Sequence, residues 1–326
     1  MSIMALGIDV GKAKLYVCLM SGKQYQAAAV FENTAEGHQQ LEQWLVEQAA
    51  QSAHVCLEAT GQYGYRVACY LHHLGYRVSI VNPTRIKGFA ASLMQRSKSD
   101  RIDAKVIAQF CIALEPERWQ PPLEEQQDLQ ELMRRLSAIE SMLHQEKNRE
   151  DWANHPQVKQ SVMAHISQLE AEIERLNEAI EAHFTEHNSL QEQRQLLISI
   201  PGIAEKTAAH LLAELGDLSR FTNARQLAAY CGLTPREKQS GTSVRKRPCL
   251  SKVGSSRLRK ALFMPAICAT RYNPVLQQFF NNLRERGKSK MAAVGAVMRK
   301  LLHIVYGVLK HRKPFDPEYG SPKAAT

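Results

Sequence analysis

Apolar and polar positions alternate along the first 120 residues in two periods, that of strands and that of helices. The pattern predicts strands at 4–10, 14–21, 25–32, 54–58 and 77–81, and helices at 34–50, 63–74 and from about residue 100. The last strand ends at Asn82-Pro83, a pair that favours a turn. The order is therefore three successive strands, a helix, and then strand, helix, strand and helix.

That order of elements is the order of a ribonuclease H-like domain. The sequence therefore predicts an α/β, ribonuclease H-like (RuvC-like) fold over residues 1–120. Residues 116–122 (PERWQPP) interrupt the pattern and mark the end of this domain.

Two long helices are predicted next, because apolar positions recur alternately every three and four residues. The two series are Leu129, Leu132, Leu136, Ile139 and Leu143, and, after a break at 154–156, Val162, Ile166, Leu169, Ile173, Leu176 and Ile180. This spacing is typical of a coiled-coil seam, so we expect a helical coiled-coil insert over 121–195. The periodicity leaves open a hairpin within one chain, pairing with another subunit, or a plain helical bundle.

The rest of the chain predicts a mostly α carboxy-terminal domain over 196–315 and a tail at 316–326. Its opening segment, SIPGI at 199–203 before an amphipathic helix, is typical of the second half of a helix-hairpin-helix. In that element a glycine turn, here Gly202, presents backbone N–H groups to a DNA phosphate; a simple capping turn is the alternative. Further helices are expected at 221–232, 256–271, 274–285 and 289–311, with a loop at 233–256.

Charge is distributed very unevenly along the chain. The net charge is +10, but residues 196–326 hold 23 Lys and Arg against 7 Asp and Glu, which leaves a net of −6 for residues 1–195. So basic a half indicates a polyanionic partner, with nucleic acid as the first expectation. A membrane surface is the weaker alternative, because the basic half lacks a clearly amphipathic helix with a large aromatic face.

The cysteines and the apolar runs predict the compartment. Seven cysteines are widely spaced and form no C-x-x-C pair, which favours a reducing compartment and argues against a zinc site. The sequence has no segment typical of a signal peptide and no uninterrupted apolar run of 18 residues. We therefore expect a cytoplasmic protein that does not enter a membrane.

Four carboxylates occupy the positions that a metal-dependent nuclease would use. Asp9 and Glu58 each end an apolar run, and Asp100 and Asp103 lie one turn apart where a helix opens. Oxygen ligands converging from separate elements suit Mg²⁺ or Mn²⁺, and two such ions can serve phosphoryl transfer. Singly, Asp9 could be a turn residue, and Asp100 and Asp103 could stabilise only the helix amino terminus.

A second candidate site lies in the segment 239–247 (QSGTSVRKR), where small residues precede three consecutive cations, Arg245, Lys246 and Arg247. Such a segment suits close approach to a phosphodiester. A serine here is either a nucleophile or a hydroxyl that contacts phosphate. From residue types alone the contact role is favoured, because no neighbouring histidine supplies a base.

The carboxylate set, the opening GIDVGK and the later CGLTPREKQSG and LSKVGSSRLRKAL together resemble the DEDD transposases of bacterial insertion sequences, which are relatives of the pilin-gene invertases. The resemblance covers essentially the whole chain. It implies that Asp9, Glu58, Asp100 and Asp103 are the catalytic metal ligands of a RuvC-like domain. It also implies that a serine, here Ser240 with Ser243 as the neighbour to test next, forms a covalent phosphoserine with DNA.

The same resemblance implies partners for the chain. They are donor and target DNA, a structured noncoding guide RNA (a bridge RNA) and further copies of the chain in a homotetramer with composite sites. The cations expected to hold backbone phosphates are Arg245, Lys246, Arg247, Lys252, Arg257, Arg259 and Lys260. No recognisable RNA-binding module is present in the sequence.

Three other functions fit parts of the sequence. A junction-cleaving endonuclease on the same RuvC-like core would use water as its nucleophile, although the large basic second domain argues against it. A sugar kinase of the actin-like class would need a second copy of the GIDVGK turn, and none follows residue 120. A non-enzymatic nucleic-acid-binding protein would use the carboxylates only structurally.

Overall fold

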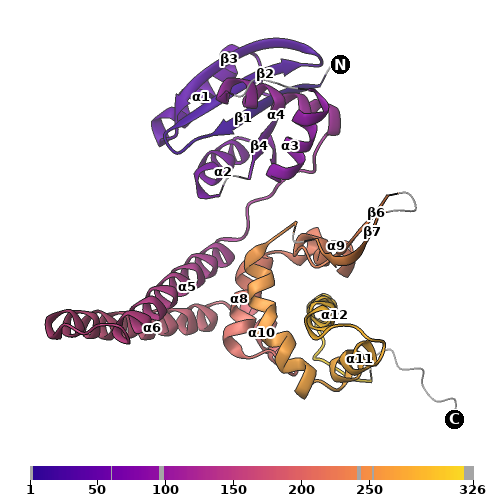
Figure 1. Ribbon diagram of the computed structural model, residues 1–326. Helices are drawn as coiled ribbons and strands as arrows, with labels where there is room; N and C mark the ends of the chain where they lie inside the picture. The colour runs from indigo at the N-terminus through magenta and orange to yellow at the C-terminus, as the bar shows by residue number, and fades with distance from the viewer. Residues whose placement is uncertain (1–2, 60, 95–98, 241–243, 252, 319–326) are drawn as a thin grey trace. The chain divides into compact units, whose positions relative to one another are not determined.

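The computed structural model describes residues 3–59, 61–94, 99–240, 244–251 and 253–318. The chain divides into two compact units, Met1–Pro121 and Pro122–Thr326 (Figure 1). Each unit has its own hydrophobic core.

The first unit is built on a five-stranded sheet with the order β3-β2-β1-β4-β5. Strands β1 (Met4–Val10), β2 (Lys14–Ser21) and β3 (Gln24–Glu32) form an antiparallel meander. Strands β4 (His54–Glu58) and β5 (Arg77–Val81) continue the sheet in parallel with β1. The strands and this mixed topology are those predicted for a ribonuclease H-like domain.

Alternation along the strands separates two faces of the sheet. Leu6, Ile8 and Val10 of β1 pack with the helices α1 (Ala35–Glu47) and α2 (Tyr65–His73). Ala5 of β1 packs on the opposite face with the helices α3 (Pro83–Ser92) and α4 (Asp100–Leu114). The sheet is therefore covered on both sides, and each strand residue is assigned to one layer by its parity.

Helix α3 was not predicted from the sequence. Asn82 caps it by accepting a hydrogen bond from the Thr84 N–H, and Pro83 occupies its first turn, where a proline needs no hydrogen-bond partner. Ile86, Phe89, Ala90 and Leu93 recur at helical spacing, but the segment is short, and among its residues Ile86 is the fully buried one. The Asn-Pro pair that ends β5 thus also begins a helix.

The second unit opens with two long helices, α5 (Glu124–Glu150) and α6 (Pro156–Glu186). They pack on each other as an antiparallel hairpin: His183 lies within 2.7 Å of the Glu125 carbonyl oxygen, and Lys147 pairs with Glu170 at 2.8 Å. Leu129, Met133 and Phe184, near the open end of the hairpin, belong to the core of the whole second unit. In this chain the two helices therefore pack within one molecule.

The rest of the second unit is mostly helical. The helices are α7 (Asn188–Ile198), α8 (Glu205–Leu215), α9 (Ala224–Tyr230), α10 (Ser256–Tyr272), α11 (Pro274–Glu285) and α12 (Lys290–His311), with a short 3-10 turn η2 (Leu218–Arg220). Among the described helices α12 is the one long and apolar enough to cross a membrane, but 61% of its apolar window is buried inside the unit. We interpret α12 as the core helix around which the others pack.

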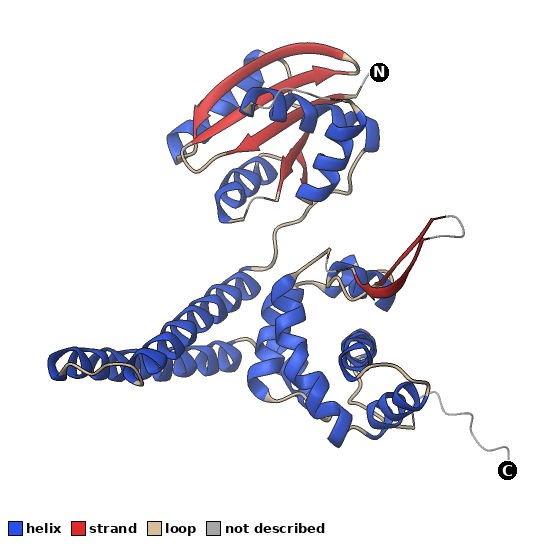
Figure 2. Ribbon diagram, viewed as in Figure 1, coloured by secondary structure: helices blue, strands red, loops and turns tan. Residues whose placement is uncertain are grey.

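The expectation that residues 233–256 form a loop is wrong. Strands β6 (Pro235–Ser240) and β7 (Val244–Leu250) form an antiparallel hairpin, drawn in red in Figure 2. A two-stranded ribbon need not bury either face, so its sequence can be polar throughout and lack the alternation that identifies a strand. Apart from this hairpin, the described part of the second unit contains no strand, so it does not repeat the first unit as a sugar kinase would require.

Candidate functional site

Asp9 and Glu58 lie next to each other at the carboxyl ends of two parallel strands. The register of β1 and β4 pairs Gly7 with Cys56 and Ile8 with Leu57, so Asp9 and Glu58 are the next residues along. Neighbouring strands are about 4.8 Å apart, which brings the two carboxylates within reach of a shared cation. Both side chains are half-buried.

The same parity that sorts the core also directs these two carboxylates to one side of the sheet. Ala5 of β1 and Cys56 of β4 pack on the α4 side, and Asp9 and Glu58 follow them at even spacing along the same strands. Their neighbours Val10 and Leu57 pack on the α1 and α2 side. Asp9 and Glu58 therefore belong to the face that α4 covers.

Helix α4 runs antiparallel to β4, which places its amino terminus at the same edge. The Cys111 thiol contacts the His54 carbonyl oxygen at 3.5 Å, at the opposite end of β4. From Cys111 back to Asp103 the helix rises about 12 Å. From His54 to Glu58 the strand advances about 13 Å. Asp103 therefore lies near the level of Glu58 along the sheet.

The helix start is fixed by Ser99, whose hydroxyl accepts a hydrogen bond from the Ile102 N–H. Asp100 is exposed and Asp103 is half-buried, and both stand in the first turn. Acidic residues in the first turn stabilise a helix through its dipole, whether or not they also bind a metal. That role accounts for the pair on α4, but it does not explain why Asp9 and Glu58 meet the same helix end.

The donor set fits a hard divalent cation. Four carboxylates supply only oxygen ligands, which is the preference of Mg²⁺ and Mn²⁺. As the side chains stand, no three His, Cys, Asp or Glu of the described chain are gathered closely enough to form a metal-binding group. Carboxylates that share a site repel one another until a cation binds between them.

Asn33 ties together the two loops at this edge, and the sequence did not indicate it. Its Nδ2 group donates to the Gly11 carbonyl at 3.1 Å and to the Tyr63 carbonyl at 3.0 Å. Its Oδ1 atom accepts from His38 Nε2 at 3.0 Å. Burial, assisted by the nearby Arg66 charge, lowers the pKa of His38, which keeps this histidine neutral. The contacts span 22 and 30 residues, too far apart for a local sequence signal.

In the second unit, Ser240 ends β6 opposite Val244 of β7. The structure describes the backbone of Ser240 but not its side chain, and Ser243 lies outside the described residues. Arg245 and Lys246 follow on β7, where Lys246 stands opposite Lys238 in the register.

The other predicted cations have different surroundings. The Arg259 guanidinium donates to the carbonyls of Cys231 and Gly254, at 3.0 and 3.1 Å, and so holds the loop before α10. The side chains of Arg257 and Lys260 are both exposed. The Arg257 guanidinium forms an ion pair with the Glu214 carboxylate at 3.6 Å. Arg247 lies on β7, and Lys252 is outside the described residues. Arg259 thus has a structural role that the sequence did not reveal.

The turn between α7 and α8 contains Gly202 with φ +104°, a conformation that favours glycine. A Cβ atom at this position would lie 2.9 Å from the Ala269 Cβ of α10. Internal packing therefore accounts for the glycine, and phosphate binding by this turn stays a prediction. Glu205, in the first turn of α8, would oppose a phosphate there.

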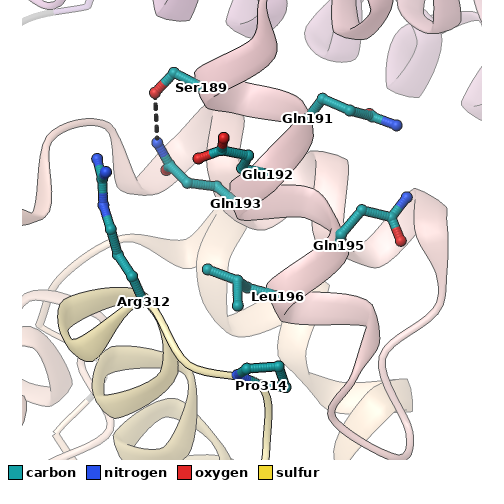
Figure 3. A pocket seen from close by; sticks show the side chains of 8 residues that line it. All are labelled: Ser189, Gln191, Glu192, Gln193, Gln195, Leu196, Arg312 and Pro314. Atoms are coloured by element: carbon teal, nitrogen blue, oxygen red, sulfur yellow. Dashed lines mark hydrogen bonds between the residues drawn. The ribbon is translucent and has the colours of Figure 1, made fainter.

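A surface cavity of about 420 Å³ lies between α7 and the segment that follows α12 (Figure 3). It is lined by Ser189, Gln191, Glu192, Gln193, Gln195, Leu196, Arg312 and Pro314. None of the residues predicted to act in catalysis or nucleic-acid binding lines it. We therefore assign the chemistry to the edge of the sheet and not to this cavity.

Comparison with known proteins agrees with these assignments of domain type. Residues 6–151 match a family model for a transposase of the DEDD, IS110 type, and residues 194–281 match the model described as transposase IS116/IS110/IS902 family. The Thermus thermophilus RuvC structure matches 36% of this chain and 100% of its own at 16% identity, with a TM-score of 0.29.

Two relatives match almost the full length of the chain. The pilin gene-inverting protein of Moraxella bovis is 34% identical over 97% of this chain and 98% of its own. The protein of the same description from Moraxella lacunata is 34% identical over the same shares. With both family models matched in order and such coverage at this identity, the chain belongs to the IS110-type family of DEDD transposases and recombinases of insertion sequences.

Proposed function

We propose that the protein cuts and rejoins DNA as a transposase or recombinase, and that Asp9, Glu58, Asp100 and Asp103 form its metal-dependent catalytic centre. The observation that carries this proposal is the register of β1 and β4, which makes Asp9 and Glu58 neighbours at the edge where α4 begins. DNA as the substrate follows from the transposase family and from the gene-inverting relatives. DEDD and RuvC-like nucleases generally use divalent ions, and Mg²⁺ or Mn²⁺ suits these four carboxylates.

In this proposal two ions would be held by Asp9 and Glu58 of the neighbouring strands together with Asp100 and Asp103 of α4. The cations would supply positive charge to the scissile phosphate and lower the pKa of the attacking hydroxyl. The protein's own part is to keep the carboxylates aligned. It does so by anchoring both strand ends in a sheet and the helix end through the Ser99 cap.

We assign the nucleophile to Ser240, with Ser243 as the alternative. The Ser240 hydroxyl oxygen forms a bond to phosphorus, the bond from phosphorus to one deoxyribose oxygen breaks, and the proton ends on that leaving oxygen. The reverse step, by a hydroxyl of another strand, restores the serine and rejoins the DNA. No oxidant or energy source is needed, because the phosphoserine conserves the phosphodiester bond energy.

Nucleic acid is held, in this proposal, by the β6–β7 hairpin and the start of α10. The register pairs Lys238 with Lys246 and Gln239 with Arg245, so the ribbon concentrates positive charge that a phosphate backbone would neutralise. Lys252, Arg257 and Lys260 extend this charge along the chain, and Arg259 supports the loop between them. A structured guide RNA is proposed as a second ligand of the same surface.

The α5–α6 hairpin is proposed to join copies of the chain into a homotetramer. Large apolar side chains are exposed on its outer part, with Trp152 at 84%, Val158 at 52% and Met163 at 51%. Such residues at the end of a narrow two-helix arm are favourably buried against another subunit. Oligomerisation would allow the carboxylates of one subunit to act with Ser240 of another.

The experiment uses the full chain with the nucleic acid that copurifies with it, which is sequenced to identify a guide RNA and its DNA sites. DNA carrying those sites is then incubated with Mg²⁺ and analysed after denaturation for a covalent protein–DNA adduct. We expect the adduct with the parent protein, and its loss in Glu58→Gln and in Ser240→Ala. Glu47→Gln, an exposed carboxylate at the end of α1, and Ser52→Ala, an exposed serine in the turn before β4, are the matched controls.

Each outcome decides one part of the proposal. An adduct in Ser240→Ala would remove the serine assignment and direct it to Ser243. Normal recombination by Glu58→Gln would exclude the carboxylate centre. Strand cleavage that never yields an adduct would favour the alternative, a RuvC-like endonuclease that uses water on the same carboxylates.

A further inference from the structure

An exposed aromatic side chain stands beside the proposed catalytic edge and has no part in the core. Tyr63 belongs to the 3-10 turn η1 (Gln62–Gly64), which follows β4, and its side chain is 48% exposed. The next residue, Gly64, is buried against the ends of β1 and β4: a Cβ atom there would lie 3.0 Å from Leu57 Cδ1 and 3.6 Å from Val10 Cγ2. Leu57 and Val10 are the chain neighbours of Glu58 and Asp9.

The backbone at Tyr63 is held firmly although the side chain is exposed. Asn33 Nδ2 donates to the Tyr63 carbonyl at 3.0 Å and to the Gly11 carbonyl at 3.1 Å, and the Asn33 N–H donates to the Ala13 carbonyl at 2.9 Å. One asparagine thus joins the turn that follows Asp9 to the turn that follows Glu58. A side chain presented on a fixed backbone loses little entropy when it binds a ligand.

Two exposed cations belong to the segments that adjoin this tyrosine. Lys12 is exposed in the turn that Asn33 holds, and Arg66 is exposed in the first turn of α2. Arg66 is also close enough to His38 to lower its pKa. An aromatic face with cations beside it is the combination that proteins use to bind unpaired nucleotides: the base stacks and the flanking phosphates meet the charges.

We infer that Tyr63 stacks on an unpaired DNA base beside the scissile phosphate, with Lys12 and Arg66 contacting the adjoining phosphates. Tyr63 lies in the turn that follows Glu58, at the edge of the sheet where Asp9 and Glu58 are neighbours, so it is placed to contact a strand bound at that edge. A base pair in a duplex hides its faces, so the platform selects a strand that is already open. The inference rests on the proposed catalytic edge and adds the structural state of its DNA.

The test is photo-crosslinking with the full chain and short oligonucleotides that carry 5-iodouracil at single positions. Metal is left out, so no cleavage is needed. We expect a crosslinked peptide that contains Tyr63 with single-stranded DNA, and a yield at least about tenfold lower in Tyr63→Leu. Tyr63→Trp should keep the crosslink. Tyr25→Leu is the matched control, because Tyr25 is 56% exposed on β3 but pairs with Met20 at the opposite end of the sheet.

Three results would overturn the inference. Equal yields in Tyr63→Leu and the parent would show that this residue does not stack. A Tyr63 crosslink that forms equally well in duplex DNA would exclude selection of an unpaired strand. A crosslink obtained only with 5-iodouridine RNA would assign the platform to RNA. Because the readout needs no catalysis, it stands separately from the Glu58→Gln experiment, and urea unfolding of each variant verifies the fold.

Discussion

Gly7 of β1 lies directly against the backbone of Ala104 in α4. A Cβ atom on Gly7 would come within 2.2 Å of the Ala104 carbonyl oxygen and within 2.3 Å of the Ala108 nitrogen. Gly7 is two residues before Asp9, and Ala104 directly follows Asp103. The close contact between Gly7 and Ala104 allows α4 to pack on the sheet. The same contact therefore sets the distance between Asp9 and Asp103, two of the proposed metal ligands.

We expect Gly7→Ala to separate α4 from β1, because the added methyl group meets backbone and not a flexible side chain. Overpacking of this kind costs about 1–3 kcal/mol of unfolding free energy, measurable by urea denaturation. The rate of metal-dependent DNA cleavage should fall by more than the loss of folded protein accounts for. Gly88→Ala in α3 is the control: apart from the backbone of its own helix turn, nothing lies within 4 Å of its Cβ position, and alanine favours a helix. If Gly7→Ala cleaved normally, the spacing argument would be wrong.

The sequence alone was sufficient to assign these carboxylates to strand ends and a helix start, because the ends of apolar runs predict where strands end. Asp9 and Glu58 end strongly apolar runs, and the Ser99 cap begins a clear helix, so both the elements and their order could be predicted. The contacts of Gly7 with Ala104 and of Asn33 with Gly11 and Tyr63 could not. They join residues far apart in the chain, and no local preference records which backbone comes close to which.

We expect Mn²⁺ or Mg²⁺ to raise the melting temperature of the protein. A cation that binds only the folded state adds about 2.7 kcal/mol when present at one hundred times its dissociation constant. It would also relieve the repulsion between Asp9 and Glu58 at neighbouring strand ends. The shift, measured by calorimetry, should disappear in Glu58→Gln and persist in Glu47→Gln. An undiminished shift in Glu58→Gln would place the cation elsewhere.

Acidification should loosen the loops that Asn33 joins. The folded-state pKa of His38 is lowered by burial and by Arg66, so the unfolded chain binds a proton more readily than the folded one. The stability that neutral His38 contributes is therefore present above its ordinary pKa, about 6.5, and is lost as the pH falls below it. His38→Gln, which can still donate to Asn33 Oδ1, should flatten this dependence in urea unfolding.

The control for that measurement is His73→Gln, an exposed histidine at the end of α2. It should leave the acid-induced loss of stability unchanged. An unaltered pH profile in His38→Gln would show that protonation of this histidine does not govern the Asn33 contacts.

Less of the structure of the second unit could be predicted from the sequence, because the segments in question consist mainly of polar and charged residues. The β6–β7 hairpin carries charge where a strand usually carries apolar residues, so it was expected to be a loop. Arg259 was expected to face DNA, yet its guanidinium donates to the carbonyls of Cys231 and Gly254. A cation that holds a loop and one that holds a phosphate have the same signature in a sequence.

Arg194 should prove to be a structural clamp. Its side chain is 4% exposed, it pairs with Glu181 through two contacts of 2.6 Å, and it reaches Glu205 at 3.2 Å. Glu181→Ala should cost about 1–2 kcal/mol, less than for a fully buried pair because Glu181 is 58% exposed. Glu205→Ala should lower the unfolding free energy by less than Glu181→Ala does. The variant with both substitutions should lose more than the sum of the two single losses, because the buried guanidinium then lacks both carboxylates. Additive losses in urea unfolding would contradict this.

The salt dependence of DNA binding tests the basic hairpin. Each phosphate neutralised by Lys or Arg releases about 0.9 counterion from duplex DNA, which sets the slope of log K against log salt concentration. Replacing Arg245, Lys246 and Arg247 together by Gln should reduce that slope by about 2–3 and weaken binding most at low salt. The control variant Arg284→Gln with Arg286→Gln and Lys288→Gln removes the same charge from the exposed end of α11 and the turn after it. Equal slope changes in the two variants would show that charge acts generally, with no preference for the β6–β7 hairpin.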